Sequence, residues 1–167
     1  QSRSSAASDV YKRQTIDGYT SGVVTATIST TAIADLDDLT GTGNAYTITV
    51  ATADVTAAAL KTVNDATTVA VTATAVTNIT GSKTDLASVY GGGITGLGNE
   101  TITVSDANIT STEANTIDGY TSGVVTATIS TTDITALDDL TGTGNAYTIT
   151  VATCLLYTSD AADDLLC

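Results

Sequence analysis

Apolar and polar residues alternate in six short stretches of the chain, and this period-two pattern predicts six β-strands. Each stretch consists largely of Val, Ile, Thr or Tyr, which are residues typical of strands. The predicted strands are Val23–Ile28, Tyr46–Val50, Thr68–Val71, Thr101–Val104, Val124–Ile129 and Tyr147–Val151. The last inward positions of these strands are Ile28, Val50, Val71, Val104, Ile129 and Val151, at spacings of 22, 21, 33, 25 and 22 residues. This spacing predicts coils of about 22 residues, with one insertion around the Gly-rich segment 91–99.

A second apolar pattern, at helical spacing, follows several of the predicted strands. Four hydroxyl residues lie where they can cap the start of a helix: Thr56, Ser82, Thr110 and Thr135. An acidic residue follows three positions after each of them except Thr56. The side chains then expected to face the core are Leu60, Val63, Leu86, Val89, Ile117, Leu137 and Leu140. The chain is therefore predicted to be α/β, a repeat solenoid with a parallel β-sheet and short helices. An all-β solenoid is the alternative.

One long segment of the chain occurs twice. Thr15–Thr52 returns as Thr116–Thr153 with 35 of 38 residues unchanged. Near-identity over this length is typical of a unit selected for how it stacks, because a catalytic site needs one non-repeating set of residues. Under this interpretation the six inward anchors form one buried column on adjacent parallel strands.

The two ends of the chain differ from the middle and are interpreted as translated sequencing adapter. Ser4–Gln14 reads SSAASDVYKRQ, and Cys154–Asp163 reads CLLYTSDAAD. One oligonucleotide used in tagmentation libraries encodes both when it is read in opposite orientations. We therefore expect residues 1–14 to be a disordered artefact, 154–167 to be an artefact of the same kind, and 15–153 to be a solenoid fragment cut at both sides.

Composition restricts the classes of function. Residues 15–153 contain 37 Thr, and only Lys61 and Lys83 oppose 14 acidic residues, a net charge of −12. Such a surface does not favour nucleic acid as a partner. Both cysteines lie in the adapter-like end, so no disulfide is expected, and no apolar run is long enough for a membrane span. Disorder is the competing interpretation of a Thr-rich acidic chain, but the regular Ile and Val spacing argues against it.

Catalytic motifs are incomplete in this sequence. The chain has no His, which removes the usual base of a hydrolase triad, and DGYTSG lacks the Gly-x-Ser-x-Gly pattern. The segment GGGITGLG lacks the Lys-Ser/Thr that follows a phosphate-binding loop. We therefore predict no enzymatic activity and no organic cofactor.

Acidic residues before a repeated Gly-x-Gly-Asn motif form the one candidate metal site. The ligands proposed are Asp37, Asp38 and Asn44, with their copies Asp138, Asp139 and Asn145. Carboxylate and amide oxygens are the ligands that Ca²⁺ prefers. The alternative is that Asp37 and Asp38 only solvate a first helical turn and complement its dipole.

Pairs of threonines in the strands form a second candidate surface. Each pair would point away from the core: Thr25 and Thr27, Thr47 and Thr49, Thr101 and Thr103, Thr126 and Thr128, and Thr148 and Thr150. A parallel stack would align them in two columns, an arrangement similar to the Thr-x-Thr arrays of ice-binding β-solenoids. Thr is also simply a polar residue well suited to an exposed strand.

Two resemblances bear on fold and function. Residues 125–142, VTATISTTDITALDDLTG, resemble the leucine-rich repeat family in coil spacing, but the family's Asn position holds Thr31, Ala53, Thr74, Ala107 and Thr132. More broadly, TITVSDANIT and DLASVYGGGITGLGNE resemble the Thr-, Ala- and Gly-rich repeats of large surface or secreted proteins of aquatic bacteria. That resemblance implies a structural or adhesive segment of an extracellular or cell-surface protein. Its partners would be neighbouring repeats and surface glycans or matrix.

Overall fold

The computed structural model describes residues 5–131 and 134–151 and has mixed α/β structure. The predicted fold class is thereby confirmed at the level of α/β, and the all-β alternative is wrong, because capped runs such as 57–65 form helices. The α-helices of the described residues are α1 Ser5–Asp17, α2 Ile33–Leu36, α3 Ala57–Asp65, α4 Lys83–Tyr90 and α5 Ser111–Asp118, followed by the 3-10 helix η1 Ile134–Leu137. The strands are β1 Thr25–Thr27, β2 Ala45–Thr47, β3 Asp54–Thr56, β4 Val71–Thr72, β5 Asn78–Gly81, β6 Ile94–Thr95, β7 Thr101–Val104, β8 Val125–Thr131 and β9 Ala146–Val151.

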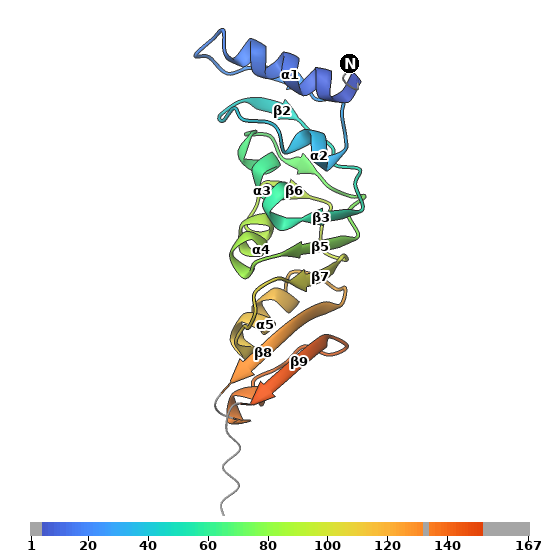
Figure 1. Ribbon diagram of the computed structural model, residues 1–167, viewed down its shortest axis with the longest axis vertical. Coiled ribbons are helices and arrows are strands. Elements are labelled where there is room, and N and C mark those ends of the chain that lie inside the picture. The colour runs from blue at the N-terminus through green and yellow to red at the C-terminus, as the bar shows by residue number, and fades with distance from the viewer. Residues whose placement is uncertain (1–4, 132–133, 152–167) are drawn as a thin grey trace, which may run out of the picture.

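All paired strands run parallel. They form a five-stranded sheet in the order β3-β5-β7-β8-β9 and two two-stranded sheets, β1-β2 and β4-β6. Partner residues are 20 to 24 positions apart in sequence, as in the pairs Thr25 with Ala45 and Asp54 with Asn78. The chain advances along the long axis of the molecule, from α1 at one end to β9 at the other (Figure 1).

The predicted single column of six anchors is wrong in register, although Ile28, Val50, Val71, Val104 and Ile129 are buried. Their strand partners are other residues: Val71 pairs with Ile94, Val104 with Gly81 and Ile129 with Ile149. The Gly-rich segment is not an insertion, because it contributes its own strand β6. Positive φ angles of 86° at Gly93 and 88° at Gly96, which L-residues rarely adopt, let the chain turn sharply on both sides of that strand.

The helix starts were predicted correctly at three of four positions. Thr56 Oγ1 accepts the N–H of Ala59 at 3.2 Å, and Ser82 Oγ accepts the N–H of Asp85 at 3.1 Å. Thr110 and Glu113 form a full capping box ahead of α5. The fourth prediction was wrong, because Thr135 lies inside η1, which begins at Ile134.

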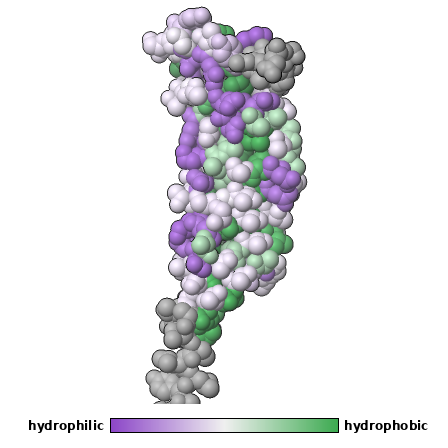
Figure 2. Space-filling view, in the orientation of Figure 1, coloured by the Kyte–Doolittle hydropathy of each residue, from purple (hydrophilic) through white to green (hydrophobic). Residues whose placement is uncertain are grey.

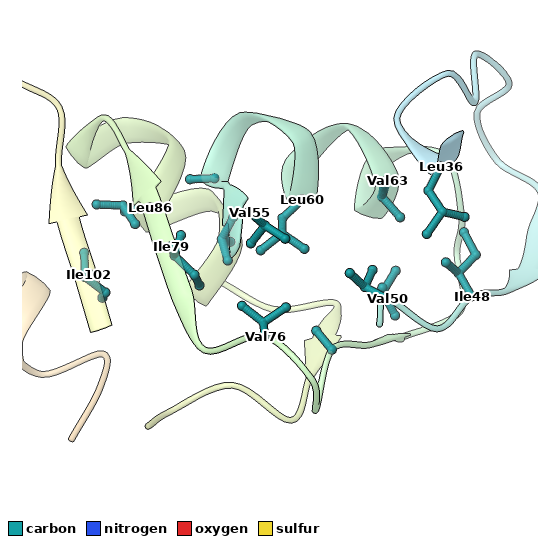
Figure 3. Packing of buried hydrophobic residues seen from close by; sticks show 14 of the residues in the cluster. Leu36, Ile48, Val50, Val55, Leu60, Val63, Val76, Ile79, Leu86 and Ile102 are labelled. Atoms are coloured by element: carbon teal, nitrogen blue, oxygen red, sulfur yellow. The ribbon is translucent and has the colours of Figure 1, made fainter. Parts of the chain in front are cut away.

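The core lies between the helices and the strands. Its inward side chains Leu60, Val63, Leu86, Val89 and Ile117 are buried as predicted, whereas Leu137 and Leu140 are half-buried. Figure 3 shows Leu60 and Val63 of α3 directed toward strand residues, with Val63 near Leu36 and Ile48. The helix α3 thus packs on the strands β3 and β5, and α5 packs on β8.

The expectation of disorder at the N-terminus does not hold for its described part, because residues 5–17 form α1. Val10 is 3 % exposed and packs into the apolar cluster, and Arg13 donates to the carbonyl of Thr27 at 3.2 Å. A helix is favoured here because it covers apolar surface at the end of the core. The adapter-like origin of this segment stays a prediction, and residues 154–167 lie outside the described residues. Across the described part of the chain, no helix is long and apolar enough to cross a membrane.

Candidate functional site

The first Gly-x-Gly-Asn motif, 41–44, lies against a carboxylate of the preceding coil. Asn44 is 2 % exposed, and its Nδ2 donates to Asp17 Oδ1 at 2.8 Å. Its Oδ1 accepts the N–H of Val24 at 2.9 Å. One buried amide therefore joins two segments that lie 20 and 27 residues earlier in the chain.

The second copy repeats this arrangement atom for atom. Asn145 Nδ2 donates to Asp118 Oδ1 at 2.6 Å, and Asn145 Oδ1 accepts the N–H of Val125 at 2.9 Å. We call each set, Asp17 with Asn44 and Asp118 with Asn145, an Asp-Asn brace. Because an amide without partners is costly where it is buried, as Asn44 is, each brace holds together segments that lie far apart in the sequence.

The glycines of the motif leave room for the brace. A Cβ at Gly41 would lie 2.6 Å from Asp17 Oδ2, and one at Gly142 would lie 2.7 Å from Asp118 Oδ2. Gly43 and Gly144 have φ angles of 78° and 82°, the left-handed region that favours glycine. The motif was singled out in the sequence as part of a metal site, but its partner Asp was missed. The signal that could have identified Asp17 and Asp118 is their identical spacing from the motif in both copies.

The six predicted calcium ligands separate into two groups in the structure. Asn44 and Asn145 are the amides of the braces, whereas Asp37, Asp38, Asp138 and Asp139 are exposed. In residues 5–131 and 134–151, no three His, Cys, Asp or Glu side chains gather where they could hold a metal ion. Calcium binding by these residues stays a prediction.

Replacing Asn44 with Asp separates the brace from the calcium hypothesis. A brace requires an N–H donor toward Asp17, so a second carboxylate there should destabilise the fold by about 2 kcal/mol through repulsion and a lost hydrogen bond. A calcium site would gain a charged ligand, and millimolar calcium would then restore the melting temperature. We expect thermal melts with calcium and with chelator to show the same loss, and Asp37→Asn, an exposed control, to melt like the original chain.

A buried carboxylate closes the Gly-rich segment. Glu100 is 1 % exposed and accepts the N–H groups of Gly98 at 2.8 Å and Asn99 at 3.0 Å, together with the hydroxyl of Tyr90. The Tyr90 ring stacks on Tyr120 with centroids 4.7 Å apart and planes inclined by 10°. Burial, and then the hydrogen bond to Glu100, raises the pKa of the Tyr90 hydroxyl above its ordinary value, so this group stays a donor. Glu100 was missed in the sequence because its segment was interpreted as a flexible insertion.

A pocket of about 540 Å³ lies on the helical side of the molecule, between α4 and α5. Its lining combines apolar side chains with hydroxyls and one ion pair, and consists of Lys83, Thr84, Ala87, Ser88, Glu113, Thr116, Ile117 and Tyr120. Lys83 Nζ lies 2.5 Å from Glu113 Oε1, and this hydrogen bond raises the pKa of Lys83 and lowers that of Glu113. The two charges neutralise each other, which leaves the pocket without an excess charge to select a ligand.

Across β3, β5, β7 and β8 the exposed threonines form one column rather than the two predicted, and Thr128 pairs with Thr148 across β8 and β9. Register aligns Thr56, Thr80, Thr103 and Thr126 across four strands of the five-stranded sheet. The neighbouring column is Asp54, Asn78 and Thr101, in which Asn78 donates to Asp54 and Thr101 donates to Asn78. The pairs Thr25 and Thr27, and Thr47 and Thr49, lie outside this sheet, because β1 pairs only with β2.

Comparisons with protein-family models, with curated proteins and with solved structures gave no match. Function therefore has to be inferred from the contacts of the chain itself.

Proposed function

We propose that residues 15–153 are a stretch of β/α solenoid with rungs of about 22 residues, and that this stretch serves as a structural or adhesive segment of a larger extracellular or cell-surface protein. The recurrence of the Asp-Asn brace carries this proposal. The same asparagine amide, buried in the first copy and half-buried in the second, joins the same donor and acceptor atoms in both copies, 101 residues apart. A unit that reproduces its stacking contacts in this way is built to be repeated.

The polar contacts of the described residues support a structural role rather than a catalytic one. The brace residues bind one another, Glu100 binds backbone amides, and Lys83 binds Glu113. Exposed hydroxyls along β3, β5, β7 and β8 give a hydrated face that needs no partner to stay soluble. An acidic, Thr-rich surface suits neighbouring repeats, surface glycans or matrix as partners and does not suit nucleic acid.

A polysaccharide panel tests this proposal against a carbohydrate-degrading function. The purified chain is incubated with soluble glycans, and both retention on immobilised glycan and the release of reducing ends are measured. We expect no release of reducing ends, with or without retention. Glu113 is the acidic residue in the α4–α5 pocket. Release of reducing ends by the original chain that is lost in the Glu113→Gln variant would contradict the proposal.

Ice binding is the alternative that the threonine column favours, and we predict that the chain lacks it. Ice recognition requires a flat and regular array, because many weak contacts must fit one lattice at once. Here a single Thr column runs beside Asp54 and Asn78, whose charge and amide interrupt the array. A nanolitre freezing assay should show no thermal hysteresis and no faceted crystals. Faceting that disappears in Thr103→Tyr but persists in Thr62→Tyr, an exposed control on α3, would establish the alternative instead.

A further inference from the structure

The two copies of the repeated segment differ sharply in burial at one set of identical residues. Ile48 is fully buried, whereas its copy Ile149 is 46 % exposed. The same holds for four further pairs, buried in the first copy and half-buried in the second: Leu36 and Leu137, Leu39 and Leu140, Tyr46 and Tyr147, and Val50 and Val151. Because the local sequences agree, the difference comes from what lies next to each copy.

The first copy is covered by the segment 51–73. Thr68 N–H donates to the carbonyl of Asn44 at 2.8 Å, and Thr72 N–H donates to the carbonyl of Ile48 at 3.0 Å. Tyr46 N–H donates to Thr67 Oγ1 at 2.9 Å. On the helical side, Val63 of α3 reaches Leu36 and Ile48 (Figure 3). This segment thus supplies both strand pairing and apolar cover.

The second copy presents the same atoms at the end of the five-stranded sheet. Strand β9 is the outermost strand there, and hydrophobic surface appears beside the grey residues at this end of the molecule (Figure 2). The hydroxyl of Tyr147 is buried and, among the described residues, has no hydrogen-bond partner. We call the surface formed by Leu137, Leu140, Tyr147, Ile149 and Val151 the end surface.

We propose that the end surface docks a further rung with the sequence of Ala53–Ala73, joined to it in the same polypeptide. The inference rests on the proposed solenoid and on the adapter-like interpretation of residues 154–167, and it adds to them the sequence of the rung that the end surface fits. Continuity in one chain is favoured by the first copy, where the residues directly after the strand already bind the coil beneath. Ala51 N–H donates to the carbonyl of Thr31 at 2.9 Å, and Thr52 Oγ1 accepts the N–H of Ile33 at 2.9 Å. The docked rung therefore starts without any intervening linker.

A lengthened chain tests this proposal, in which residues 154–167 are replaced by a copy of Ala53–Asp118. Ile48→Asn and Ile149→Asn, the same substitution in the same local sequence, are made in both the original and the lengthened chain. In the original chain we expect Ile48→Asn to lower the melting temperature by about 5 °C or more and Ile149→Asn to change it by about 2 °C at most. In the lengthened chain the two substitutions should lower the melting temperature about equally. Amide exchange at Tyr147 and Ile149 should be about 100-fold slower than in the original chain.

The control is a lengthened chain in which the equivalents of Leu60 and Val63 in the appended copy, and only there, are replaced by Asp. This appended copy should not dock, so amide exchange across β9 should stay as fast as in the original chain. The proposal is overturned if Ile149→Asn stays neutral in the lengthened chain. It is also overturned if the original chain already buries Ile149 by dimerising end to end, seen as a concentration-dependent mass that Ile149→Asn reduces to the monomer. The polysaccharide test is independent of these outcomes, so a failure of the structural role and a failure of the docking are distinguishable.

Discussion

Replacing Ile102 with Asp is expected to unfold the middle of the molecule. Ile102 is fully buried in β7 and pairs with Ile79 on one side and Val125 on the other. A carboxylate at this position would be buried, and neither of its two strand partners is a basic residue. The free energy of unfolding should therefore fall by about 4–5 kcal/mol, which is a large share of the stability of a typical domain. Urea unfolding followed by far-UV circular dichroism measures this loss.

The adjacent position supplies the matched control. Thr103 belongs to the same strand, but its side chain is exposed in the threonine column. Thr103→Asp adds the same charge to the opposite face and should cost about 1 kcal/mol or less, mainly through lower strand propensity. Equal losses for the two variants would mean that burial on the inner face does not hold this sheet together.

Replacing Glu100 with Ala should destabilise the Gly-rich segment more than any other single change there. The variant leaves three donors without their acceptor: the Tyr90 hydroxyl and the N–H groups of Gly98 and Asn99. Since unsatisfied buried donors cost about 1–3 kcal/mol each and water can reach part of the segment, we expect a loss of about 2–4 kcal/mol. Amide exchange should accelerate at Gly98 and Asn99 before the rest of the chain unfolds.

Tyr90→Phe is the control for this cluster. It removes one donor, retains the stack on Tyr120 and leaves Glu100 bound to two backbone amides, so its loss should be about 1 kcal/mol. If Tyr90→Phe destabilises the fold as much as Glu100→Ala does, the Tyr90 hydroxyl and not the Glu100 carboxylate is the group that stabilises this segment.

Sequence patterns located three helix starts and six of the nine strands in the described residues, but they missed β3, β5 and β6. Thr56, Ser82 and Thr110 each carry a local capping signal, and a cap acts within one turn of the helix that it starts. The strands β3, β5 and β6 were missed because each carries a single apolar residue, Val55, Ile79 or Ile94, and one residue shows no alternation. Strand register was wrong for a related reason: inward positions reveal which face of a strand is buried, but not which residue of the next coil lies opposite.

The candidate site shows the same division between local and long-range information. The motif ending at Asn44 was visible in the sequence, because glycine and asparagine at fixed spacing are local features. Its role depends on Asp17 and Val24, which lie 27 and 20 residues earlier in the chain and reach it only in the folded structure. Likewise the role of Glu100 depends on the hydroxyl of Tyr90, ten residues earlier, which reaches it after the chain has turned back.

In the proposed solenoid, the direction in which the strands pair has a mechanical consequence. Because the strands cross the long axis and pair with partners 20 to 24 residues away, the interstrand hydrogen bonds run along that axis (Figure 1). Tension applied to the two termini acts first on the hydrogen bonds that hold the outermost coil to its neighbour. Once that coil has detached, the tension acts on the next coil, because the chain passes directly from one coil to the next. Each coil that detaches adds about 65–80 Å of extended polypeptide where it had occupied about 5 Å of height. Under load such a molecule lengthens in discrete steps at nearly constant force, and so dissipates energy before any covalent bond is strained.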